Sequence, residues 1–168
     1  IFRPNYTITR GTEAALSDLE RQRWLIENML LMPKHEAWIT RDVRIRRATG
    51  TTRIEGATLD EEAVRKLERS GQTGRHTEGE HENLNALQAY DFIDFLSDQR
   101  DITLDELVVR QLNREFMKGF SDTLTPGSYR RGENKIGMFT PPNQGDVPSL
   151  MRSFALWLRE DQELHPVI

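Results

Sequence analysis

The sequence predicts an all-helical domain that carries one small β-hairpin, and three observations support this. Apolar residues recur every three or four positions along most of the chain, which is the spacing of amphipathic helices. Threonines and acids precede these apolar runs, where helix N-caps belong, and Pro or Gly follows several of them. The stretch "LTPGSYRRGENKIGMFTPPNQGD" (124–146) contains four glycines and three prolines, so it cannot be helical.

The first two helices are predicted from the spacing of apolar residues and from Pro33. Thr12 is placed to cap a helix that Pro33 ends, and its apolar positions are Leu16, Leu19, Ile26 and Leu30. Residues 36–48 predict a second helix, which is more basic.

Two capping boxes predict the next helix starts. Thr58-Leu59-Asp60-Glu61 precedes a short apolar run with Gly71 past its end, and Thr103 with Glu106 opens another helix. Between them, "GQTGRHTEG" (71–79) is predicted to be a polar linker, followed by a helix with Leu84, Leu87, Phe92 and Phe95.

The last third combines the predicted hairpin with the clearest helical stripe of the chain. Ser128–Arg131 and Lys135–Thr140 are predicted to pair as two short strands around a turn at 132–134. Pro148 suits the first turn of the final helix, whose apolar positions are Val147, Leu150, Met151, Phe154 and Leu158.

Composition limits the classes of protein and of site. A chain of 168 residues, 36% of them hydrophobic, can bury one sizeable core. The absence of cysteine excludes disulfides and cysteine-based zinc sites. No apolar run approaches the roughly 20 residues that cross a membrane, and no signal peptide is visible. We therefore expect a cytoplasmic protein without membrane contact.

Both ends of the sequence suggest a segment of a longer protein. It starts with Ile1, and His165-Pro166 resembles a helix start only two residues before the last residue.

Several groups of residues are candidate sites. His76 and His81 lack the spacing of a zinc motif and are interpreted as solvated loop histidines. The run "RDVRIRR" (41–47) could bind nucleic acid, but the net charge of −4 favours a solvated helix face or a salt-bridge partner for the acidic helices. In "TTRIEG" (51–56), Glu55 alone would be interpreted as an acid near the start of the next helix, where the helix dipole favours it.

Several motifs in order resemble the Fic family. They are "PNYTIT", then "TTRIEG", "TLDEEAVRKLERSG", "ENLNALQAYDFI", "PGSYRRGENKIGMFTPP", "VPSLMRSFALWL" and "ELHPVI". The first is similar to the N-terminal part of many bacterial Fic proteins, and "TTRIEG" resembles the family's inhibitory motif, Ser/Thr-x-x-x-Glu-Gly/Asn. The resemblance implies a helical Fic-type domain with a hairpin called the flap, an N-terminal helical region at 1–76 and the first part of the Fic core at 77–168.

The resemblance implies an autoinhibited protein adenylyltransferase, which moves AMP from ATP to a hydroxyl side chain of a target protein. The family's catalytic signature, His-Pro-Phe-x-Asp/Glu-Gly-Asn-Gly-Arg-x-x-Arg, is absent from residues 1–168, so no catalytic residue is assigned here. We expect that signature about fifteen residues after Ile168, together with the groups that hold ATP and Mg²⁺, and we expect the segment alone to be inactive.

The same resemblance assigns two sets of site residues. Thr51, Glu55 and Gly56 form the inhibitory motif, in which the carboxylate occupies an arginine that would otherwise hold the ATP γ-phosphate. Thr51 either hydrogen-bonds near that site or caps the helix. The flap residues, which pair with an extended stretch of the target and contact the nucleotide, are Ile136, Gly137, Met138 and Phe139, with Thr140, Pro141 and Pro142 closing the hairpin.

Two other interpretations stay open. The chain could be a non-catalytic helical interaction module that binds a partner through the hairpin or the basic helix. It could also belong to an enzyme that transfers a different phosphate-containing group. The sequence does not define the target protein, and a homo-oligomer is compatible with it.

Overall fold

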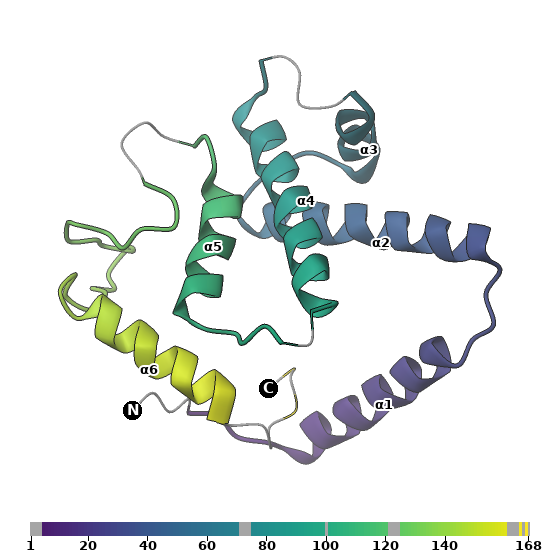
Figure 1. Ribbon diagram of the computed structural model, residues 1–168, viewed down its shortest axis with the longest axis horizontal. Helices are drawn as coiled ribbons and strands as arrows, with labels where there is room; N and C mark the ends of the chain where they lie inside the picture. Colours follow the sequence, from purple (N-terminus) through teal and green to yellow (C-terminus); the bar gives the residue numbers. More distant parts are fainter. Residues whose placement is uncertain are drawn as a thin grey trace. The chain divides into compact units, whose positions relative to one another are not determined.

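Six helices account for most of the computed structural model, which describes residues 5–70, 75–99, 101–120, 125–160, 165 and 167 (Figure 1). In chain order they are α1 (Arg10–Glu27), α2 (Pro33–Ile54), α3 (Glu61–Ser70), α4 (Glu78–Ser97), α5 (Glu106–Met117) and α6 (Val147–Glu160). Within those ranges no β-strand forms. The predicted helical fold is confirmed, whereas the predicted hairpin is not seen.

The chain divides into two units, and residues 3–42 form the smaller one. Its described part holds α1 and the beginning of α2, and none of its side chains is buried. The cap of α1 is Thr9, not Thr12 as predicted. The Thr12 N–H donates to Thr9 Oγ1 over 3.2 Å, and the Thr9 N–H donates to Thr12 Oγ1 over 3.3 Å, so Thr12 is the return arm of the capping box.

The larger unit, which includes Val43–Ile168, contains the hydrophobic core. Helix α4 packs against both α3 and α5, and α6 packs against α5 (Figure 1). The second half of α2 contributes Ile45 and Ala48 to a buried cluster with α3 and α4; its other members are Val64, Ala86 and Leu87. Leu59, Tyr90 and Phe116 pack against this cluster. The core therefore joins the end of α2 to α4.

Two other predicted caps are wrong because an aspartate nearer to the helix caps it instead. Asp60 Oδ1 accepts from the Ala63 N–H over 2.8 Å at the start of α3, and Asp105 Oδ1 accepts from the Val108 N–H over 3.0 Å at the start of α5. Thr58 and Thr103 lie two residues further from these free N–H groups. At the start of α4, Thr77 and Glu80 form a complete capping box.

The region predicted to be a hairpin is an irregular loop before α6. Among its described residues, the only β-pairing is a single antiparallel bridge between Ile136 and Phe139, within the second of the two predicted strands. Gly137 opens the turn with φ +58°, which matches the first central position of a II′ turn. The two predicted strands do not pair; the Arg130 guanidinium instead donates to the carbonyl of Pro142.

The remaining element predictions have mixed outcomes. Pro148 is the second residue of α6, as expected for a first turn. Residues 71–74 of the predicted linker, which include Gly71, and Pro166 of the predicted helix start fall outside the described residues. The boundary at residues 76 and 77 stays a prediction. None of the described helices is long and apolar enough to span a membrane.

Candidate functional site

The inhibitory motif "TTRIEG" forms the end of α2, which continues six residues beyond the predicted helix. Glu55 follows the last helical residue, and Gly56 adopts φ +99°. The Gly56 N–H donates to the Arg53 carbonyl over 3.1 Å, and the Ala57 N–H donates to the Thr52 carbonyl over 3.0 Å. This is a Schellman motif, in which a glycine in the left-handed region ends the helix.

The position of Glu55 does not fit its interpretation as an acid near the start of the next helix. Glu55 is the C-cap of α2, and α3 begins only at Glu61. A carboxylate at a helix C-terminus is disfavoured by the dipole by about 0.3–1 kcal/mol. The interpretation of Glu55 as a dipole-stabilised acid at a helix start is therefore wrong, and local helix stability does not explain this residue.

Buried hydrogen bonds hold the last turn of α2 against α4. Thr52 Oγ1 lies 3.1 Å from the Ala48 carbonyl and 3.1 Å from Asn83 Oδ1. The Asn83 side chain is fully buried, and its Nδ2 donates to the Gly79 carbonyl over 2.9 Å. Because buried polar groups without partners are costly, this network fixes both the register of α2 on α4 and the Asn83 rotamer.

Thr51 contacts α4 through a second hydrogen bond. Its Oγ1 lies 2.5 Å from the hydroxyl oxygen of Tyr90, whose ring packs edge-on against Phe116 with 6.2 Å between the ring centroids. Thr51 is in the last turn of α2, so it does not cap a helix start, and this alternative is excluded. Asn83 and Tyr90 could not be predicted from the sequence, because they lie 31 and 39 residues along the chain from their partners and no local pattern marks them.

The Glu55 carboxylate, in contrast to these threonines, is exposed. Within the described part of the chain it makes no hydrogen bond and no ion pair. Helix α2, held against α4, thus ends in a carboxylate that is available to pair with a cation outside the described residues. The inhibitory roles of Thr51, Glu55 and Gly56 stay predictions.

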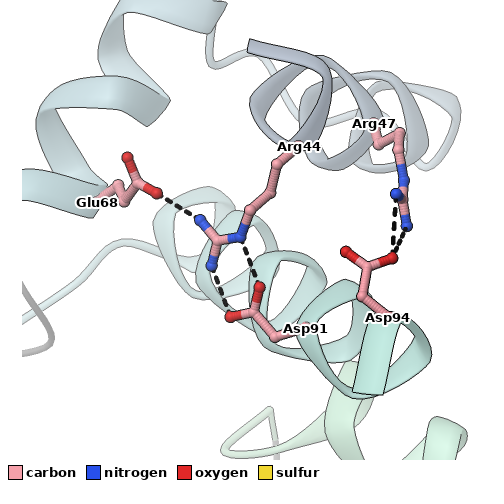
Figure 2. Close-up of polar contacts among 5 residues, drawn as sticks. All are labelled: Arg44, Arg47, Glu68, Asp91 and Asp94. Carbon is pink, nitrogen blue, oxygen red and sulfur yellow. Dashed lines mark hydrogen bonds and ion pairs between the residues drawn. The ribbon is translucent and has the colours of Figure 1, made fainter. Parts of the chain in front are cut away.

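Three arginines of α2 form ion pairs with α3 or α4: Arg46 lies 3.6 Å from Glu61, and Figure 2 shows the pairs of the other two, Arg44 and Arg47. Arg44 Nε and Nη2 each donate to one carboxylate oxygen of Asp91 over 2.6 Å, and Nη1 donates to Glu68. Arg47 donates to Asp94 over 3.2 Å. Hydrogen bonding to Asp91 is the main reason that the pKa of Arg44 is raised above its usual value. The salt-bridge interpretation of "RDVRIRR" is confirmed.

The predicted flap residues Ile136, Gly137, Met138 and Phe139 are all exposed. Met138 is fully exposed, and Ile136 and Phe139 are each more than 60% exposed. Two hydrogen bonds of 3.0–3.1 Å between the backbones of Ile136 and Phe139 close the turn. Exposed apolar side chains on a short turn suit contact with a partner, and the assignment of a docking role stays a prediction.

Two hollows lie near these elements. One of about 610 Å³ is lined by the end of α5 and the loop before the flap, at Asn113, Met117 and residues 125, 126 and 128–134. A smaller one of about 150 Å³ is lined in part by His76 and His81. His76 is only about 10% exposed and its ring packs edge-on against His81, so the interpretation of both as solvated loop histidines is wrong. The described residues contain no group of three or more His, Asp or Glu side chains placed to hold a metal ion.

Comparison with known proteins points to one family. The chain is 36% identical over 69 residues to the "Protein adenylyltransferase Fic" of Drosophila grimshawi. The matched residues make up 40% of this chain and 14% of that protein. The chain is 29% identical over 122 residues to the Drosophila ananassae protein of the same name. This match makes up 70% of the chain and 24% of that protein. No family model matches the sequence.

The structural comparison agrees with the sequence comparison. A crystal structure of a Fic family protein from Desulfovibrio desulfuricans G20 superimposes with a TM-score of 0.74 at 22% identity, and the match covers 99% of this chain and 50% of that one. The predicted resemblance to the Fic family is confirmed. The chain spans a quarter or less of these two curated relatives and half of the solved Fic structure, so the activity of the whole protein is a matter for proposal.

Proposed function

We propose that this chain is the regulatory and target-docking part of a protein adenylyltransferase that Glu55 holds inactive. The names of the Drosophila relatives support the reaction class, and the Fic fold supports the architecture. The observation that carries the regulatory part is the end of α2: a hydrogen-bonded, buried last turn presents an exposed carboxylate without a partner among the described residues.

The proposed inhibition is competition between two anions for one guanidinium. The guanidinium belongs to the Fic catalytic signature, which we place after residue 168. A carboxylate and a phosphate both accept paired hydrogen bonds from arginine, so Glu55 can occupy the place of the ATP γ-phosphate. ATP then binds without its α-phosphate aligned for attack, and transfer is slow because in-line geometry is lost.

The reaction that Glu55 would restrain is a phosphoryl-type displacement. The target hydroxyl oxygen forms a bond to the α-phosphorus, and the bond from that phosphorus to the oxygen bridging to the β-phosphate breaks. Pyrophosphate leaves with the electron pair, and a base takes the hydroxyl proton. Mg²⁺ would accompany ATP; the described residues contain no group of three or more His, Asp or Glu side chains placed to hold it.

The loop around Met138 is proposed to dock the target. Its exposed backbone next to the Ile136–Phe139 bridge can accept an extended segment as an added strand, and the exposed apolar side chains can hold alternate residues of that segment. Gly137 leaves open space on its side of the turn, since a Cβ built there meets no atom within 4 Å.

The test is incorporation of labelled AMP from ATP by the full-length protein. Glu55→Gln keeps the shape of the side chain and removes its charge, so we expect more labelling, including self-modification. Glu62→Gln is the matched control, because Glu62 is an exposed acid on α3 that pairs with Lys66 over 2.8 Å and has no proposed role. Equal labelling by all three proteins would remove Glu55 from the inhibitory role. Absence of labelling and of ATP binding in every variant would favour a non-catalytic interaction module.

A further inference from the structure

One guanidinium connects three helices beside the inhibitory motif. Arg44 of α2 holds Asp91 of α4 through two parallel hydrogen bonds, and its remaining nitrogen reaches Glu68 of α3 (Figure 2). Arg44 and Glu68 are each about four-fifths shielded from solvent, whereas Asp91 is half exposed. Bidentate arginine–carboxylate pairs fix direction as well as distance, so Arg44 restricts rotation and sliding of α2 on α4.

The guanidinium of Arg47 is connected to Thr51 through the ring of Tyr90. Both Nη atoms of Arg47 donate to Asp94 Oδ1 over 3.2 and 3.3 Å, and its Cζ lies 4.3 Å from the centre of the Tyr90 ring. The hydroxyl of the same ring hydrogen-bonds Thr51. A cation over an aromatic face is attractive, so Arg47, Tyr90 and Thr51 form one connected set.

Residues 44, 47, 51 and 55 follow the three- to four-residue spacing of one helix face. The side chains of the first three contact α4, while the Glu55 carboxylate makes no hydrogen bond or ion pair among the described residues. The location of its carboxylate therefore depends on the helix end that carries it, and the arginines act together with the buried Thr52–Asn83 hydrogen bond to set where that end lies.

We propose that Arg44 and Arg47 are positioning residues that keep the end of α2, and with it Glu55, in the inhibitory place, so that breaking their ion pairs activates the protein. This inference rests on the proposed function of Glu55. The core residues of α2 supply most of the burial that keeps it folded, and partly exposed ion pairs contribute little to global stability. Loss of the ion pairs is thus expected to release the helix end before it unfolds the domain.

Charge exchange in the full-length protein tests the proposal. Arg44→Glu places a third carboxylate beside Glu68 and Asp91, so labelling should rise severalfold, toward the level of Glu55→Gln. Adding Asp91→Arg restores one positive and two negative charges at the same place, so labelling should fall back toward wild type. A merely structural role predicts the opposite sign, because a damaged fold loses activity rather than gaining it.

Arg110→Met is the matched control. Arg110 donates to the Gly127 carbonyl over 2.7 Å and lies over Tyr129, so its loss also removes a structural arginine, but one on α5 that does not touch α2. We expect no rise in labelling. If Arg44→Glu fails to fold by circular dichroism, Asp94→Asn decides instead, since it removes only the ion pair of Arg47 and should give a smaller rise.

The outcomes separate the two proposals. Higher labelling by Glu55→Gln without a rise in Arg44→Glu or Asp94→Asn would overturn the positioning role and leave the proposed function intact. A rise in Arg110→Met equal to that in Arg44→Glu, or no reversal by Asp91→Arg, would also overturn it. No rise in Glu55→Gln would contradict the proposed function, and the positioning role with it.

Discussion

The end of α2 and the loop around Met138 both carry predicted site residues, yet they are built in opposite ways. At the end of α2, Thr52 and the fully buried Asn83 hydrogen-bond in the interior, and a glycine with positive φ ends the helix. In the loop, one antiparallel bridge supports a turn whose apolar side chains face solvent. The end of α2 is held in place by its own hydrogen bonds, whereas the loop around Met138 leaves backbone groups unpaired among the described residues.

This contrast matches what each region is proposed to do. A carboxylate that replaces a phosphate must stay within hydrogen-bond distance of one guanidinium, which requires a rigid support. A segment that adds a partner strand needs unpaired N–H and C=O groups, and a completed hairpin with a paired edge would offer fewer of them. The single Ile136–Phe139 bridge is therefore compatible with docking, although it is not the predicted hairpin.

The largest expected difference between the two regions is in global stability. Ile45→Ala removes a fully buried side chain of the core cluster and should lower the free energy of unfolding by about 2–5 kcal/mol. Ile136→Ala in the loop, where the side chain is 63% exposed, should change it by no more than about 0.5 kcal/mol. Urea denaturation checks both variants, and similar losses in the two would contradict the contrast.

A second pair of variants tests whether the end of α2 depends on its glycine. Gly56 has φ +99° with open space around its Cα, so Gly56→Ala should cost about 1–2 kcal/mol from backbone strain alone. Gly50 lies in the interior of α2, also in open space but without a positive φ. Gly50→Ala should stabilise by about 0.5–1 kcal/mol, and thermal unfolding reports both signs. A stabilising Gly56→Ala would show that the helix does not end there as described.

The smallest expected effect is a pH dependence of the helix that supports α2. The hydrogen bond from the Thr77 backbone N–H holds the pKa of the Glu80 carboxyl below its usual value of 4.5, and the Thr77 hydroxyl adds to this. A lowered folded-state pKa stabilises the protein above the unfolded pKa, and this is lost as pH falls through the folded pKa. Unfolding midpoints from pH 6 to pH 3 should therefore converge between wild type and Glu80→Gln. A gap that stays constant over this range would exclude a contribution from Glu80.

Periodicity predicted where the helices lie, because apolar stripes record which face each helix buries. It did not locate the caps of α1, α3 and α5. Each of these segments offers more than one acceptor, and only the backbone path decides whether Thr9 or Thr12, or Asp105 or Thr103, meets the free N–H. The cap of α4 was not predicted either: residues 71–79 were interpreted as a linker, but α4 begins at Glu78 inside it, where Thr77 and Glu80 hydrogen-bond each other's backbone N–H.

The site was predicted only where a motif marks it. The resemblance identified Thr51, Glu55 and Gly56, but local patterns ended the helix at residue 48. The extra turns are held against α4 by Thr51 and Thr52, which hydrogen-bond to the distant Tyr90 and Asn83. Such long-range partners leave no mark in a window of neighbouring residues. The predicted strand pairing failed for a related reason: the Gly137 turn closes on Ile136 and Phe139 within one predicted strand.

The central claim is that the Glu55 carboxylate stands in for the γ-phosphate of ATP, and nucleotide binding tests it most directly. Isothermal titration of the full-length protein with ATP and with ADP, in wild type and in Glu55→Gln, separates the terminal phosphate from the rest of the nucleotide. Freeing the guanidinium should strengthen ATP binding by about 10- to 100-fold, the equivalent of a charged hydrogen bond of about 1.5–3 kcal/mol, while ADP binding stays the same. An equal change for both nucleotides, or none for either, would contradict the claim.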